Sequence, residues 1–103
     1  MKHLHVTLLL FMLMSMVSNE AKATIIDGIN YELYTYTNEA TVVSIPNGYT
    51  SSVSIPSKVT YNGVEYSVTS IGNYAFQDCS HLISVTIPNT VTSISGSAFY
   101  GCI

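Results

Sequence analysis

The sequence predicts a β-rich solenoid, in which the chain winds into coils that stack on one another. An internal repeat is the first reason: residues 71–79 return as residues 94–102, with Ile, Ala, Phe and Cys each recurring after 23 positions. A fixed period of this length is typical of solenoids, because each repeat forms one coil. Composition is the second reason: all eight Tyr follow residue 23, together with most of the Thr, Val and Ile, and these residue types favour strands.

The first 23 residues are predicted to be a secretory signal peptide. Lys2 gives a basic start, residues 4–17 are mostly apolar, and Ala21-Lys22-Ala23 is an A-x-A cleavage site. A retained membrane anchor is the alternative, but an apolar run of 14 residues is shorter than the roughly 20 that span a bilayer. We therefore expect cleavage, no membrane insertion of the mature chain, and a secreted or cell-surface protein.

The mature chain carries few charges, and they exclude two classes of partner. Residues 24–103 are long enough for one small domain, with Lys58 as their only Lys or Arg against five acidic residues. Nucleic acids and anionic membranes are bound through clustered Lys and Arg. We expect neither as a partner.

Residues 24–50 are predicted to form a β cap over the first coil. Residues 25–36 alternate in hydrophobicity around Asp27-Gly28, which is a hairpin signal. A capping element is expected here, because the end of a solenoid exposes core and unpaired backbone. The solenoid itself is assigned to residues 51–103, as one full and one incomplete repeat.

A hairpin insertion is predicted at residues 60–68. Residues 53–60 match residues 85–92 at an offset of 32, nine more than the basic period. Asn62-Gly63 lies within this insertion and is a preferred pair for a type I′ turn, which needs positive φ at both positions. The insertion lengthens the first coil without changing its frame.

Each coil is predicted to contain a strand with one apolar and one hydroxyl-bearing face. In residues 82–88, Val85 and Ile87 share the face that points to the core. Ser84 and Thr86 share the outer face. Pairing ends at the proline that follows, because proline has no N–H to donate.

Short helical turns are expected to close the coils. Residues 73–79 and 97–102 have apolar side chains at three-to-four spacing, which suits a single helical turn with those side chains facing inward. Equivalent side chains of successive coils, notably Phe76 and Phe99, are then stacked one rung apart, roughly 4.8 Å.

These repeats resemble the BspA-like leucine-rich repeats. The residues that carry the resemblance are Ile71-Gly72, Ala75-Phe76, Cys79, Leu82, Val85-Thr86-Ile87-Pro88 and Val91-Thr92-Ser93-Ile94. The resemblance is specific over residues 53–103 and looser back to residue 25. It implies a leucine-rich-repeat solenoid wound as a right-handed coil in a secreted or surface protein, and several members are implicated in adhesion to host matrix proteins or to other cells.

No residue pattern points to catalysis, to a metal site or to a cofactor. Cys79 and Cys102 hold equivalent positions in successive coils, and we expect buried thiols, with a disulfide as the alternative in an oxidising compartment. Two Cys without paired His do not make a zinc site. His81 is expected in a solvated loop, and the acidic residues are scattered rather than paired. We expect a non-enzymatic protein.

Hydroxyl side chains on the outer strand faces are the candidate partner-binding residues: Ser52, Ser54, Ser84 and Thr86. Hydroxyls close to Tyr residues suit recognition of an extracellular protein or glycan, although hydroxyls also simply keep an exposed face soluble. We therefore expect an interaction module for cell-surface adhesion or for protein or glycan binding. The alternative is a truncated fragment of a repeat protein with no independent function, and the uncapped C-terminal edge offers a route to self-association.

Overall fold

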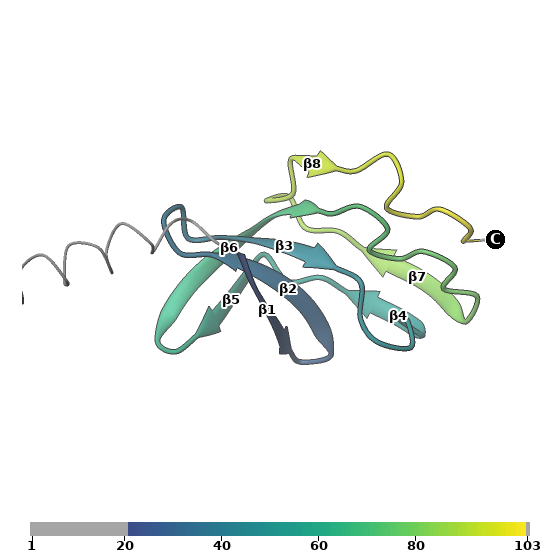
Figure 1. Cartoon of the computed structure of the whole chain (residues 1–103), viewed down its shortest axis with the longest axis horizontal. Coiled ribbons are helices and arrows are strands. Elements are labelled where there is room, and N and C mark those ends of the chain that lie inside the picture. Colours follow the sequence, from purple (N-terminus) through teal and green to yellow (C-terminus); the bar gives the residue numbers. More distant parts are fainter. Residues whose placement is uncertain (1–20, 103) are drawn as a thin grey trace, which may run out of the picture.

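The computed structural model describes residues 21–102. The predicted signal peptide lies outside the described residues except for its last three, Ala21 to Ala23, which belong to the first strand. Eight strands make up the regular structure of the described part (Figure 1): β1 (Ala21–Ile26), β2 (Ile29–Tyr34), β3 (Glu39–Val43), β4 (Ser51–Ser54), β5 (Lys58–Tyr61), β6 (Val64–Ile71), β7 (Leu82–Thr86) and β8 (Ser93–Ile94).

The strands form one large curled sheet and one small sheet. The order in the large sheet is β1-β2-β3-β6-β5, with β8 also paired to β6, and the small sheet is β4-β7. Pairing is antiparallel within the hairpins β1–β2 and β5–β6 and also between β2 and β3. It is parallel where strands far apart in the sequence meet, in β3–β6–β8 and in β4–β7.

The parallel strands stack the chain in three rungs, each made of a strand of the large sheet and the segment that follows it. Val42 of β3 lies opposite Ile71 of β6, and Ile71 lies opposite Ile94 of β8. Parallel stacking therefore begins at Glu39, inside the segment that the sequence assigns to the cap. Only the hairpin β1–β2 lies wholly outside the rungs at this end, and it covers the outer edge of β3.

Both predicted hairpins are confirmed, and their turns have the expected backbone. Asp27 and Gly28 have φ values of 49° and 82°, and Asn62 and Gly63 have φ values of 51° and 77°. Positive φ at both central positions is the requirement of a type I′ turn, which Asn, Asp and Gly meet most easily. The second hairpin, β5–β6, carries the extra residues of its rung away from the stack.

A β-bulge in β6 decides which of its side chains reach the core. The register between β3 and β6 shifts between Ala40 and Thr41, so that Thr69 is an extra residue on β6. Val68 and Ile71 are three positions apart, yet both point inward and are 0% and 1% exposed. The bulge supplies the change of face that strict alternation would forbid.

The predicted helical turns are not formed, because the described residues contain no helix. Residues 73–79 and 97–102 are series of tight turns, closed by hydrogen bonds from a backbone N–H to the carbonyl three residues earlier. Tyr74 and Asp78 have φ values of 58° and 52°, which lie in the left-handed region and interrupt a right-handed helix. The inward side chains of the first segment are nevertheless buried as expected, with Phe76 fully buried.

Aromatic rings stack through the centre of the rungs. Phe76 and Phe99 lie with ring centroids 5.1 Å apart and planes inclined by only 4°, which confirms the predicted stacking. Tyr49 lies on the other side of Phe76, at 4.8 Å and an inclination of 40°. One aromatic ring from each rung therefore forms a continuous stack, and dispersion and area burial along it hold the rungs together.

Candidate interaction surface

The four candidate hydroxyl residues come together on the small sheet. Ser52 of β4 lies opposite Ser84 of β7, and Ser54 lies opposite Thr86. The Ser84 hydroxyl donates a hydrogen bond of 3.0 Å to the Ser52 hydroxyl. All four side chains are exposed, while Val53 between the two serines of β4 points into the core. We call this set of four residues the hydroxyl face.

A large apolar side chain that the sequence analysis did not single out lies at the edge of the hydroxyl face. The register of β4 and β7 shifts between Ser51 and Ser52, which leaves Ile83 as an extra residue on β7. The bulge turns Leu82 toward the core and leaves Ile83 81% exposed. An exposed isoleucine beside four hydroxyls gives the surface an apolar contact, and a pattern of alternating residues carries no signal for such a bulge.

The tyrosines that are close to these hydroxyl residues in the sequence lie elsewhere in the structure. Tyr66 is buried in the core of the large sheet, and Tyr61 is half-buried beside it on β5. Tyr74 is 48% exposed and packs edge-to-face against Tyr100 of the next rung, at 6.3 Å between ring centroids. Tyr74 and Tyr100 are thus in contact with each other. The 23-residue period does not predict this contact, because the two residues are 26 positions apart.

Both cysteines within the described residues are free thiols. Cys79 is buried, and its Sγ lies 3.6 Å from the carbonyl oxygen of Gln77. Cys102 is half-buried, and its Sγ lies 2.6 Å from the carbonyl oxygen of Phe76. Neither residue belongs to a cluster of metal-ligating side chains anywhere in residues 21–102. His81 is exposed in a turn, as expected, and its carbonyl accepts the backbone N–H of Ser51.

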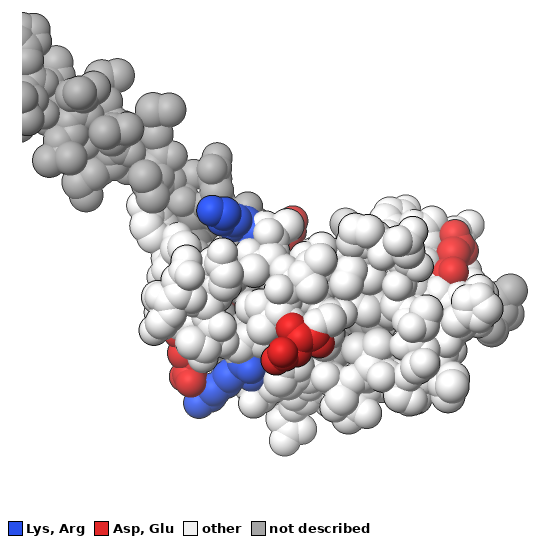
Figure 2. Space-filling model, turned by 90° about the horizontal axis from the view of Figure 1, so that it is seen from below, with Lys and Arg blue, Asp and Glu red and all other residues white. Residues whose placement is uncertain are grey.

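Charges are sparse on the described surface. Figure 2 shows a face that is mostly uncharged, with a few acidic and basic side chains, some of which lie next to each other. Lys58 lies 3.6 Å from Glu65 across the hairpin β5–β6, but both side chains are more than half exposed, so this pair contributes little to stability. No helix in residues 21–102 has the length and apolar character that a bilayer crossing requires.

Two tyrosines with buried side chains lie at the N-terminal end of the core. The Tyr49 hydroxyl donates to the carbonyl of Val43 at 2.6 Å and accepts the backbone N–H of Asn30 at 3.0 Å. Burial raises the pKa of Tyr49, and the hydrogen bond from Asn30 opposes that rise. Burial also raises the pKa of Tyr31 to about 12, with smaller contributions from Tyr49 and Asp27. Both phenols are therefore neutral at physiological pH, and the Tyr49 hydroxyl bridges two backbone groups.

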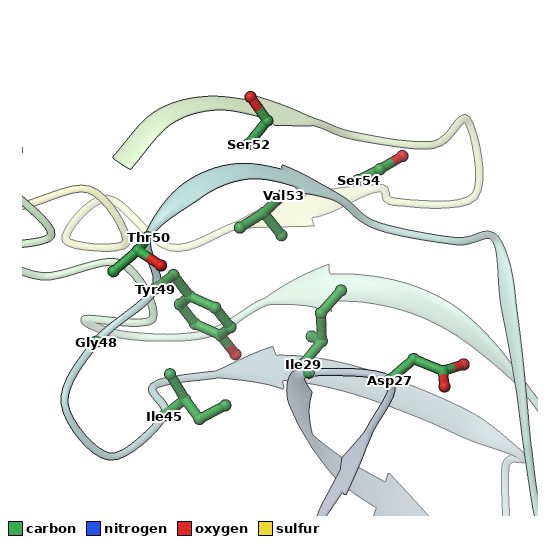
Figure 3. Close-up of a pocket in the computed structure, with 10 residues that line it drawn as sticks. Asp27, Ile29, Ile45, Gly48, Tyr49, Thr50, Ser52, Val53 and Ser54 are labelled. Carbon is green, nitrogen blue, oxygen red and sulfur yellow. The ribbon is translucent and has the colours of Figure 1, made fainter. Parts of the chain in front are cut away.

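Two cavities adjoin each other at this same end of the molecule. The first has a volume of about 260 Å³ and is lined by the β1–β2 turn, the segment 45–50 and β4. Figure 3 shows Val53 and Tyr49 pointing into it and Asp27 lying across from Ser54. The second has a volume of about 420 Å³ and continues past Ser54 to Lys58 and Val59, so that Asp27, Ile29 and Ser54 line both.

The third rung has a more exposed apolar lining than the first two. Ile94 is 48% exposed and Phe99 is 37% exposed, whereas their counterparts in the second rung, Ile71 and Phe76, are buried. A cavity of about 320 Å³ lies beside β7 and is lined by Phe99 and Cys102 among other apolar groups. This is the edge at which the sequence predicts self-association.

A protein-family model matches the chain over residues 52–103, and its description is a BspA type leucine-rich repeat region of six copies. The match includes every residue of the hydroxyl face. Among curated proteins, none is significantly similar to the chain.

Two solved structures are similar to the chain. One is a leucine-rich cell surface protein from Faecalibacterium prausnitzii, with 33% sequence identity and a TM-score of 0.66 over 79% of this chain. The other is a leucine-rich repeat protein from Bacteroides ovatus, with 34% identity and a TM-score of 0.62 over 74% of this chain. The chain covers 21% and 20% of these two proteins, so it spans about a fifth of their length.

Proposed function

The chain belongs to the BspA-type leucine-rich repeat proteins, and on this premise we propose that it is a secreted, non-enzymatic interaction module that acts in adhesion at a cell surface. Its rungs are then coils of a right-handed solenoid. The predicted signal peptide supports secretion, and the similarity to a cell surface protein supports the place of action.

The observation that carries the proposal is the hydroxyl face. Four small hydroxyl side chains lie side by side on two parallel strands, exposed and held in register by the pairing of β4 with β7. A rigid, uncharged array of hydroxyls presents donors and acceptors at fixed spacing, which suits the hydroxyl and amide groups of a glycan or of an extracellular protein. Ile83 adds apolar contact area at its edge.

Binding to immobilised extracellular-matrix proteins, and to mucin glycans in a parallel assay, tests the proposal. We expect saturable binding that is lost when Ser84→Arg and Thr86→Arg are combined, because two long cations replace the hydroxyls of β7. The matched control is Thr92→Arg with Ser93→Arg, which adds the same charge at exposed positions around β8 of the other sheet. Equal loss in both double variants, or no saturable binding by the unmodified protein, would contradict the proposal.

A further inference from the structure

We propose that the free edge of β4 is a second binding site, which accepts an extended peptide carrying a Lys or Arg side chain as an added strand. This site is distinct from the hydroxyl face, because it uses the backbone at the edge of the small sheet and not the side chains on its outer surface. It adds a class of partner to the proposed function and does not depend on glycan or matrix binding.

The backbone of β4 is unpaired on one side within the described residues. The N–H groups of Ser51 and Ile55 donate to the carbonyls of His81 and Thr86, which places both on the side that faces β7. Backbone direction alternates along a strand, so the N–H and C=O groups of Ser52 and Ser54 point to the opposite side. No strand of the described residues pairs with β4 there. An unpaired strand edge of this kind is a template for a further strand.

Space for that strand exists along the whole edge. The two adjoining cavities of about 260 and 420 Å³ run past Ser52 and Ser54 toward Lys58, and the turn of β1–β2 forms their far wall. Among residues 21–102, the hairpin β1–β2 covers the edge of β3 and no strand covers the edge of β4, so the described part is capped on one sheet only at this end.

Charge indicates which peptide fits. Asp27 lines both cavities at their junction, and it has no hydrogen-bond or ion-pair partner among the described residues. Lys58 at the far end is paired with Glu65. Asp27, Lys58 and Glu65 together leave one net negative charge at the groove, which favours a peptide with a cationic side chain near Asp27.

The same charge disfavours a second copy of this chain as the occupant. Pairing of β4 with β4 of another copy would bring two Asp27 carboxylates toward one interface, in a protein whose formal net charge is already −3. Like charges across an interface are repulsive. A foreign extended peptide meets the backbone requirement without that repulsion.

Amide NMR of the ¹⁵N-labelled protein, titrated with the peptide acetyl-Thr-Val-Lys-Val-Thr-amide, tests the proposal. We expect shift changes and slowed hydrogen exchange at Ser52 and Ser54, at peptide concentrations up to about 10 mM. The Glu counterpart of the peptide should bind more weakly. Asp27→Asn should weaken the Lys peptide by roughly twofold to fivefold, as for an exposed ion pair, and keep the turn because Asn tolerates positive φ.

Backbone methylation identifies strand addition on the unmodified protein. Methylating the amide nitrogens of one alternate set of peptide residues should abolish binding, and methylating the other set should not, because only alternate groups face β4. Glu39→Gln, at an exposed position that lines neither cavity, is the charge control for Asp27→Asn and should leave binding of the Lys peptide unchanged.

Four outcomes would overturn the inference. They are absence of any change at Ser52 and Ser54, equal binding of both methylated peptides, equal binding of the Lys and Glu peptides, and concentration-dependent protection of the β4 edge without peptide. The last outcome assigns the edge to a second copy of the chain. None of them touches binding at the hydroxyl face, which the Arg variants at Ser84 and Thr86 report separately.

Discussion

Tyr49 shows how one side chain fixes the N-terminal end of the stack. Its ring packs on Phe76, while its hydroxyl bridges the carbonyl of Val43 and the N–H of Asn30. The same residue thus joins the first rung to the second through its ring and to the cap through its oxygen. A phenylalanine would supply the first contact but leave the partly buried groups of Val43 and Asn30 without this partner, at a total cost of about 1–3 kcal/mol.

Tyr31 predicts a loss of stability at alkaline pH. Its pKa is raised from 10 to about 12 by burial, so the unfolded chain releases the phenolic proton between pH 10 and 12 while the folded chain retains it. The free energy of unfolding should therefore fall in this window by about 1.4 kcal/mol per pH unit, and the contribution is fully present below pH 10. Urea unfolding at a series of pH values measures the slope.

The variant Tyr31→Phe removes this titration, and we expect a shallower alkaline slope. Tyr100→Phe is the control, because the Tyr100 side chain is 64% exposed and its substitution should retain the slope. An identical slope in Tyr31→Phe and in the unmodified protein would show that the Tyr31 hydroxyl is not shielded from water.

Among the elements, the hairpin β5–β6 best shows how the chain accommodates extra residues. Its two strands pair in register from Lys58 opposite Ser67 to Tyr61 opposite Val64. The hairpin therefore projects from one corner of its rung, and β6 continues beyond it into the parallel ladder with β3. The Asn62-Gly63 turn signal and the nine extra residues in the repeat were sufficient to predict this hairpin, because both can be read directly from the order of residues.

Gly63→Ala tests the turn of this hairpin. Gly63 has a φ of 77°, and a Cβ atom at this position would meet no other atom within 4 Å. The expected loss is therefore conformational alone, about 1–2 kcal/mol in the free energy of unfolding. Gly96→Ala is the matched control: its added Cβ is equally free, but its φ lies outside the left-handed region, so we expect no loss. Thermal or urea unfolding of both variants measures the two losses. Equal destabilisation would contradict the expectation that the positive φ of Gly63 causes the loss.

Three features of the elements were beyond the sequence pattern. The helical turns were wrong because left-handed residues such as Tyr74 are not announced by apolar spacing. The bulge at Ile83 breaks the period of two that a regular strand has. The place of Tyr49 in the aromatic stack was missed because it precedes Phe76 by 27 positions, not 23. The Tyr49 stack and the register at Ile83 depend on contacts between rungs, which the order of residues within one repeat does not encode.

At the scale of the whole molecule, the rungs share one core, and the stacked rings are its centre. Phe76 lies between Tyr49 and Phe99 and is fully buried. Stability in such an assembly is a sum of terms within each repeat and terms between neighbours. The two phenylalanines are equivalent in the repeat, but within the described residues Phe76 has an aromatic ring on both sides and Phe99 has one on a single side. Comparing their substitutions therefore measures the energetic coupling between rungs.

We expect Phe76→Ala to destabilise the protein by about 3–5 kcal/mol, because it opens a cavity between two rungs. Phe99→Ala should cost less, about 1–2 kcal/mol, since the Phe99 side chain is already 37% exposed. Urea unfolding of the unmodified protein and the two variants gives both values, if the dependence of the unfolding free energy on urea concentration is the same for all three. Equal losses of stability in the two variants would mean that the two rings have the same environment, which would contradict the stack described above.

The two hydrogen bonds of the Tyr49 hydroxyl determine at which end of the solenoid gene duplication can add repeats. A tandem copy of the 23-residue unit placed after Ile94 would insert one more turn of ribbon and leave the bonds to Asn30 and Val43 untouched. The same copy placed between Val43 and Tyr49 would separate the hydroxyl from both of its anchors. The number of repeats can therefore vary on the C-terminal side of Tyr49, whereas an insertion between Val43 and Tyr49 would break its hydrogen bonds.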